Sequence, residues 1–239
     1  MPVLRVMVSG PVQIQTRQPE STGEEHMSDY TKVVHSSNSE EWLTERTHSV
    51  GASDTLDSTS LLRKTGQLAP FEGNIHTTAG QMLEGAVLEW WCKETGRQAD
   101  MCGWLLRREE SPFMHATPDG WNEEDRFVVE IKTAGLNQAG KWLIFKDPLV
   151  RQTAKDTVTA YQQAVWSADR FLSPPTNYWS QVQHQLYITG FDRGYLVGLI
   201  GGKKLVWFDI DRNQEYIDKR IKSCKAFMDK VGERKQQND

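Results

Sequence analysis

The chain has 239 residues, a net charge of −4 and the apolar and charged content of a soluble globular protein. This length suits one fairly large domain, or one domain with extensions. The charge excludes a protein coated in basic residues, no apolar run reaches the ~20 residues that span a bilayer, and three cysteines are too few for a four-cysteine iron–sulfur cluster. The odd cysteine count favours a reducing, cytoplasmic setting.

The first part of the chain changes character near residue 37. Residues 1–37 show weak periodicity and a polar middle, and we interpret them as an appendage to a folded domain spanning 38–239. A capping serine followed by acidic residues predicts a helix over 39–47. Residues 50–54 predict a tight turn into another short helix, and the Ser-, Gly- and Pro-punctuated residues 57–76 predict a loop.

The strongest helical pattern runs from Thr78 to Thr95, and Gly96 closes it. Its apolar residues recur at helical spacing and form one stripe, namely Ala79, Met82, Leu83, Ala86, Val87, Trp90 and Trp91. Glu84 lies at the margin of this stripe. A carboxylate there can be half-buried and can face whatever packs on the helix.

The remaining elements alternate between strands and helices. They are, in chain order, strands over 101–107 and 126–132, helices over 153–168 and 178–189, strands over 194–200 and 204–210, and a charged helix over 213–231. Gly201-Gly202-Lys203 joins the last two strands and is a hairpin signal. This order predicts an α/β domain with a central mixed β-sheet flanked by helices.

The strand over 126–132 carries an unusual pair of charges. Side chains alternate between the two faces of a strand, so Glu130 and Lys132 point the same way and Ile131 points to the opposite face. Two adjacent charges on an otherwise apolar strand are costly unless a metal or a substrate uses them. Upstream, Pro118-Asp119-Gly120 supplies a further carboxylate. This carboxylate-plus-lysine pattern is typical of metal-dependent nucleases, although an ordinary turn and a solvated strand face explain the same residues.

Four motifs occur in a fixed order along the chain. They are Gly80-x-x-x-Glu84, Pro118-Asp119-Gly120, Glu130-x-Lys132 and Gln181-Val182-Gln183, preceded by Trp42-Leu43-x-x-Arg46 and Gly51-Ala52-Ser53. Together they resemble the YqaJ-like viral recombinase family, whose best-known member is lambda exonuclease. The resemblance covers residue 38 to the C-terminus and implies the PD-(D/E)XK nuclease fold, which is restriction-endonuclease-like. The longer interval over 134–177 and the N-terminal appendage depart from the family pattern.

The resemblance implies a role for each matching residue. Asp119 and Glu130 would be metal ligands together with the backbone carbonyl of Ile131, and Glu84 would complete the acidic cluster. Hard oxygen ligands suit Mg²⁺, with Mn²⁺ as a substitute. Lys132 would assist the attacking water and stabilise charge on the phosphate.

Several further polar residues are candidates for the site. The resemblance implies that Gln181 contacts the phosphate or the attacking water, and Gln185 lies one turn further on the same face. His184 is more typical of a structural histidine than of a catalytic one. Arg46 and Ser53 match residues that hold a terminal 5′-phosphate. Lys141, Lys146, Arg151 and Lys155 either line a DNA path or form a solvated charged face.

The implied function is a Mg²⁺-dependent 5′-to-3′ exonuclease on double-stranded DNA, which resects one strand during phage-type homologous recombination. The implied partners are duplex DNA, a single-strand annealing protein and further copies of the chain in a homotrimer. The implied location is the cytoplasm of a bacterial cell or a phage-infected host. Two alternatives stay open, an endonuclease of the same fold with a restriction or repair role, and a DNA-binding module that has lost catalysis.

Overall fold

The computed structural model describes residues 30–35, 39–69, 73–142 and 174–237. Its helices are α1 (Glu40–Thr47), α2 (Ser58–Lys64), α3 (Ile75–Thr95), the 3₁₀ helix η1 (Leu136–Lys141), α6 (Thr176–Thr189) and α7 (Gln214–Gln236). Its strands are β1 (Thr31–His35), β2 (Asp100–Met101), β3 (Trp104–Arg107), β4 (His115–Ala116), β5 (Gly120–Asn122), β6 (Phe127–Ala134), β7 (Arg193–Ile200) and β8 (Lys204–Asp211). Among the described helices, none has the length and apolar character needed to cross a membrane.

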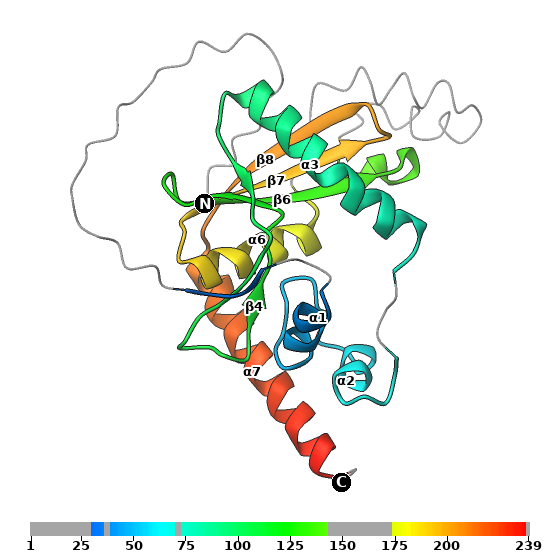
Figure 1. Ribbon diagram of the computed structural model, residues 1–239, viewed down its shortest axis with the longest axis vertical. Coiled ribbons are helices and arrows are strands. Elements are labelled where there is room, and N and C mark those ends of the chain that lie inside the picture. Colours follow the sequence, from blue (N-terminus) through cyan, green and yellow to red (C-terminus); the bar gives the residue numbers. More distant parts are fainter. Residues whose placement is uncertain (1–29, 36–38, 70–72, 143–173, 238–239) are drawn as a thin grey trace, which may run out of the picture.

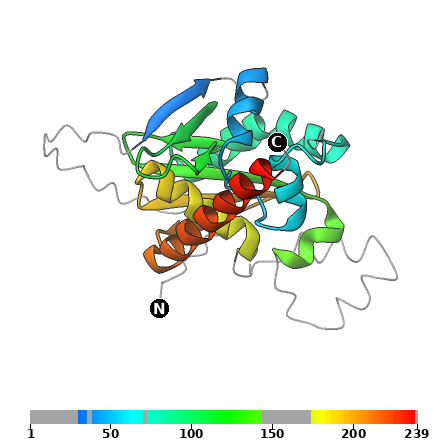
Figure 2. The ribbon, with the colours of Figure 1, turned by 90° about the horizontal axis from the view of Figure 1, so that it is seen from below.

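The main sheet is mixed, as predicted. Its strand order is β2-β5-β6-β7-β8, with β6 and β7 parallel and the other neighbours antiparallel. A second sheet has the order β1-β3-β4 and is antiparallel. Figure 1 shows α3 crossing the strands β6, β7 and β8, with α6 and then α7 on the other side of them. Seen from below in Figure 2, α7 runs beside α6 and α2.

The two faces of β6 belong to different cores. Phe127, Val129 and Ile131 pack with the second half of α3, in one buried cluster. Val128 packs with α6 in the other cluster, and the next residues on that face are Glu130 and Lys132. The predicted alternation along this strand is therefore confirmed. The face that turns toward α6 changes from apolar to charged where the strand leaves the core.

The long helix α3 is confirmed, but its apolar stripe is buried over only part of its length. The C-cap Gly96 has a φ of 69°, the left-handed conformation that ends many helices. Val87 and Trp91 are buried, whereas Met82 is 80% exposed and Leu83 is 40% exposed. The predicted stripe is therefore buried only toward the C-terminal end of α3, where Val87 and Trp91 pack in one cluster with Phe127 of β6.

Three further predictions need correction. Residues 57–76 are not all loop, since Asp57 caps the short helix α2 through a hydrogen bond from Ser60. The strand over 101–107 is two strands in different sheets, separated at Gly103, whose φ of 62° turns the chain. The stretch 1–37 is not an appendage throughout, because β1 pairs with β3 inside the fold.

The C-terminal elements follow the prediction closely. Helix α6 matches the predicted 178–189 span, β7 and β8 form the predicted hairpin, and α7 begins after the cap Asn213 and extends beyond residue 231. Gly194 lies on β7 where α6 crosses it, and a Cβ there would come 2.5 Å from Val182. This close approach fixes α6 against the sheet. The predicted helix over 153–168 lies outside the described residues.

Candidate active site

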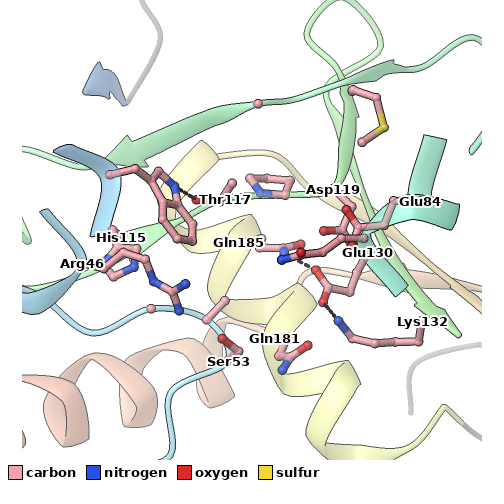
Figure 3. Close-up of a pocket in the computed structure, with 17 residues that line it drawn as sticks. Arg46, Ser53, Glu84, His115, Thr117, Asp119, Glu130, Lys132, Gln181 and Gln185 are labelled. Atoms are coloured by element: carbon pink, nitrogen blue, oxygen red, sulfur yellow. Dashed lines mark hydrogen bonds and ion pairs between the residues drawn. The ribbon is translucent and has the colours of Figure 1, made fainter. Parts of the chain in front are cut away.

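A cavity of about 370 Å³ opens where α1, α3, α6 and β6 converge. The predicted site residues that line it are Arg46, Ser53, Glu84, Asp119, Glu130, Lys132 and Gln181. Figure 3 shows the carboxylates and Lys132 at one end, Arg46 and Ser53 at the other, and the glutamines of α6 between them. The fold thus brings together side chains from six separate segments of the chain.

The acidic end forms where β6 runs past its neighbour. β5 pairs with β6 only between two limits. Asn122 lies opposite Phe127 at one end of the pairing, and Gly120 lies opposite Val129 at the other. Beyond Val129, the backbone N–H of Ile131 has no strand partner on that side and donates instead to Asp119 Oδ2 at 2.7 Å. Asp119 is therefore held against the strand, one residue before β5 begins.

Glu130 is held by two neighbours on its own face of the sheet. Lys132 forms an ion pair with Glu130 Oε1, and the Gln185 amide donates a hydrogen bond to Glu130 Oε2. Although Glu130 and Lys132 pair with each other, both side chains line the cavity. Both carboxylate oxygens of Glu130 have a donor, so the group is fixed in one orientation.

Negative charge is concentrated at this end of the cavity. Burial raises the pKa of Asp119 well above its usual range, and the nearby Glu130 raises it further. Burial likewise raises the pKa of Glu84, although the ammonium of Lys132 opposes the shift. Burial alone would lower the pKa of Lys132, but Glu130 and Asp119 hold it above its usual range. Three carboxylates thus face one ammonium.

The donor set fits a hydrated divalent cation. In the described part of the chain, no three acidic, histidine or cysteine side chains lie close enough to enclose a metal ion by themselves. Mg²⁺ retains several waters and binds through one or two carboxylates, so it does not require such a cage. Asp119 and Glu130, with Glu84 nearby, supply oxygen ligands and a negative charge that a divalent cation would offset. The carbonyl of Ile131 as a ligand stays a prediction.

The glutamines of α6 divide between the cavity and the fold. Gln181 and Gln185 both line the cavity, one turn apart, and the side-chain oxygen of each is buried without a hydrogen-bond partner. Gln183 points away, where its amide donates to the carbonyl of Asp211 and its oxygen accepts from Asn213 N–H. Buried amide oxygens without partners are uncommon and mark a place where a ligand or water binds.

The opposite end of the cavity is basic. The Arg46 guanidinium lies 4.4 Å from the ring centroid of Trp42, whose indole N–H donates to Thr117. Among the described residues, no carboxylate forms an ion pair with Arg46. The side chain is thus braced by an aromatic ring and available to an anion in the cavity. Ser53 adds a hydroxyl at the same end.

Some contributing residues were missed or undervalued from the sequence. Trp42 lies in the Trp42-Leu43-x-x-Arg46 motif, but the sequence indicates no role for its ring. The sequence favours Gln181 over Gln185, whereas in the structure Gln185 contacts Glu130 directly. The i, i+4 spacing of the two glutamines was the available signal for Gln185. Lys64, whose Nζ donates to the backbone carbonyls of Arg46 and Ser49, lies in the predicted loop over 57–76, and the sequence indicates no role for it.

Two of the remaining candidates, His184 and Lys141, do not line the cavity. His184 is buried, its Nε2 donates to the carbonyl of His115 at 3.0 Å, and its Nδ1 accepts from Arg220 at 3.5 Å. It is not among the cavity-lining residues, which agrees with a structural histidine. Lys141 is exposed in η1, and Lys146, Arg151 and Lys155 lie outside the described residues.

The fold matches solved exonuclease structures. An alkaline exonuclease from Laribacter hongkongensis, LHK-Exo, superposes with a TM-score of 0.58 at 19% identity, covering 83% of this chain and 95% of that one. A structure of the same exonuclease in complex with dAMP matches equally well. A phage-related exonuclease from Haemophilus somnus 129PT matches with a TM-score of 0.50 at 14% identity, covering 74% of this chain and 84% of that one. The fold class is that of the PD-(D/E)XK nucleases.

Sequence comparison identifies the family. The family model described as "YqaJ-like viral recombinase domain" matches residues 41–192. The chain belongs to this family, so the predicted resemblance is confirmed. It is 28% identical over 197 residues to the protein YqaJ of Bacillus subtilis (strain 168). That alignment covers 77% of this chain and 53% of the relative, so the chain spans about half the length of the curated protein it matches.

Proposed function

We propose that this protein is a Mg²⁺-dependent exonuclease that degrades one strand of double-stranded DNA in the 5′-to-3′ direction, as a step in phage-type recombination. The proposal rests on one observation, a single cavity with two chemically different ends. Carboxylates and Lys132 lie at one end, and the guanidinium of Arg46, which forms no ion pair with a carboxylate of the described residues, lies at the other. Membership of the YqaJ-like viral recombinase family and a fold shared with solved exonucleases support it.

The acidic end suits phosphodiester hydrolysis. A divalent cation bound there would neutralise charge on the phosphate and acidify a water. Asp119 and Glu130 would hold the cation, and Glu130 is already oriented by Lys132 and Gln185. The Lys132 ammonium would orient the attacking water and stabilise the charge that develops on phosphate oxygen. Gln181 presents a buried oxygen that can accept a hydrogen bond from the same water.

The basic end suits recognition of a DNA terminus. The planar guanidinium of Arg46 can form paired hydrogen bonds to a phosphate, and the Ser53 hydroxyl can donate a further one. A terminal 5′-phosphate held there would present a neighbouring phosphodiester to the carboxylates. Because only a chain end carries such a group, this geometry favours cutting from the 5′ end. A single-strand annealing protein as partner and a homotrimer remain predictions.

The decisive test uses purified full-length protein and linear duplex DNA with 5′-phosphates. We expect Mg²⁺-dependent release of nucleotides from the 5′ end and no cutting of closed circular DNA. Lys132→Ala should lower the rate by about a hundredfold or more, as loss of a preorganised charge contact does. Lys203→Ala, which changes an exposed lysine in the β7–β8 turn outside the cavity, should retain the wild-type rate.

The alternatives predict different outcomes. An endonuclease of this fold would cut closed circular DNA, and Arg46→Ala would leave its rate on a phosphorylated blunt duplex unchanged. A DNA-binding module without catalysis would release no nucleotides under any divalent cation, and Lys132→Ala would make no difference. Either result would overturn the proposed activity.

A further inference from the structure

Lys64 lies behind the basic end of the cavity, at the last residue of α2. Its Nζ donates to the carbonyl of Arg46 at 3.0 Å and to the carbonyl of Ser49 at 2.7 Å, and it forms an ion pair with Asp54 Oδ2 at 2.9 Å. An ammonium has three donors, so all of them are engaged. The side chain is only 9% exposed, which separates this lysine from an ordinary surface charge.

Asp54 extends the contact into the loop that carries Ser53. The same Oδ2 accepts the backbone N–H of Gly51 at 2.9 Å, and the Asp54 carbonyl accepts from Arg220 on α7 at 3.1 Å. Burial alone would raise the pKa of Asp54, but the Lys64 ammonium and the Gly51 N–H together lower it below its usual value. The carboxylate is thus ionised and held on both sides. Lys64 therefore joins the end of α1 to both ends of the loop over 49–54.

We propose that Lys64 is a positioning residue for recognition of the terminal 5′-phosphate, an inference that rests on the proposed function. Lys64 does not line the cavity, so it acts through the residues that do. It holds the backbone of Arg46 and the loop of Ser53 to one common point. The spacing between the guanidinium and the hydroxyl is then fixed before DNA arrives.

A purely stabilising role is the competing explanation. A buried ion pair is weak support for stability, because desolvation of both charges offsets much of their attraction. Loss of stability would reduce the folded fraction and lower all activities by the same factor. Loss of positioning would act on phosphorylated ends alone. The ratio of activities on phosphorylated and unphosphorylated ends therefore separates the two roles.

The experiment compares one linear duplex prepared with either 5′-phosphate or 5′-hydroxyl ends. For wild type we expect a higher kcat/KM on the phosphorylated end. Lys64→Met keeps the apolar stem of the side chain and removes its hydrogen-bond donors. It should lower the ratio of kcat/KM on phosphorylated to hydroxyl ends by about tenfold, mainly through KM. The reason is that a small misplacement far from the chemistry can lower the rate by up to about a hundredfold. Lys219→Met is the matched control, because it breaks a lysine–carboxylate pair that is 72% and 81% exposed. It should leave the ratio unchanged.

Each outcome decides the proposal. A folded Lys64→Met variant that keeps the wild-type ratio overturns it, whatever the absolute rates are. Mg²⁺-dependent cleavage without any wild-type preference for phosphorylated ends also overturns it, while leaving a nuclease activity in place. If Lys64→Met does not fold, Asp54→Asn provides the test, because it keeps an oxygen for the Gly51 N–H and removes the negative charge that pairs with Lys64. A reduced ratio supports positioning, and an unchanged ratio refutes it.

Discussion

Glu130 is the residue at which two other side chains of the site, Lys132 and Gln185, meet. Strand alternation places it beside Lys132, and the structure adds Gln185 as the donor to its second oxygen. A carboxylate with both oxygens engaged has little rotational freedom. Fixing a ligand through its outer hydrogen bonds typically changes metal affinity or activity by about ten- to a hundredfold. The Gln185 amide N–H is therefore expected to act by orienting Glu130.

Gln185→Leu tests this role at the residue scale. We expect the Mg²⁺ concentration for half-maximal activity to rise by about tenfold or more, because Glu130 loses one of its two orienting contacts. The measurement is a Mg²⁺ titration of nuclease activity. Gln183→Leu is the control, since this glutamine contacts Asp211 and Asn213 outside the cavity. It should lower Tm and leave the Mg²⁺ dependence unchanged. A wild-type Mg²⁺ response in Gln185→Leu would contradict the assignment.

Among the elements, α6 connects the site to the rest of the fold. One side presents Gln181 and Gln185 to the cavity, and another packs Val182 and Leu186 against the sheet. His184 links the helix to β4 through the carbonyl of His115 and to α7 through Arg220. Burial, with the nearby Arg220 cation, lowers the pKa of His184 to about 3. The links around α6 therefore depend on a neutral imidazole.

A pH dependence of stability follows from this helix contact. The unfolded chain binds a proton on His184 below pH 6.5, whereas the folded chain binds it only near pH 3. The stability from the neutral imidazole is therefore complete above pH 6.5 and declines as the pH falls, by up to about 1.4 kcal/mol per pH unit. Urea denaturation of wild type and His184→Gln at pH 7, 6 and 5, without divalent cations, measures the difference in slope.

The comparison with the variant is essential because other groups titrate in the same range. Asp119 and Glu84 have raised pKa values and contribute with the opposite sign, since the folded chain then binds the extra proton. Both carboxyl groups are present in wild type and variant, so their contributions to the pH dependence cancel when the two slopes are subtracted. Equal slopes for the two proteins would show that His184 has the same pKa in the folded and the unfolded chain, which contradicts this prediction.

At the scale of the whole molecule, the acidic cluster joins three separate segments. Glu84 comes from α3, Asp119 from the turn before β5, and Glu130 from β6. Their mutual repulsion opposes folding, and a divalent cation would convert it into attraction. Ligand binding to the folded state alone stabilises by about 2.7 kcal/mol when the ligand exceeds its Kd a hundredfold. The cluster should therefore couple the cation to global stability.

Thermal unfolding with and without Mg²⁺ tests this coupling independently of activity. We expect Mg²⁺ to raise the Tm of wild type. Asp119→Asn should raise the Tm without Mg²⁺, because it removes a buried carboxyl group whose raised pKa costs stability near neutral pH, and should abolish most of the Mg²⁺ increment. Asp125→Asn, at an exposed position in the β5–β6 turn, should behave as wild type. An equal Mg²⁺ increment in all of these proteins would argue against a cation at Asp119.

Much of this protein was predictable from local pattern. Alternation on β6, the glycine that ends α3, the hairpin of β7 and β8 and the order of the motifs all depend on residues close together in the chain. Such patterns can be interpreted without knowledge of the fold, because they reflect backbone geometry and contacts between residues close in the chain. They were sufficient to predict the fold class and the family, and to nominate the carboxylate–lysine strand.

Other features depended on contacts between distant segments. The break at Gly103 places one predicted strand in two sheets, and the α3 stripe is exposed at Met82 and Leu83 but buried at Val87 and Trp91. Lys64 gains its role only when α2 is set behind the loop over 49–54. The sequence by itself determined which residues could do the chemistry. The tertiary structure decided which of them share a cavity. β6 extends past the end of β5, so the N–H of Ile131 is free of β5 and donates to the Asp119 carboxylate.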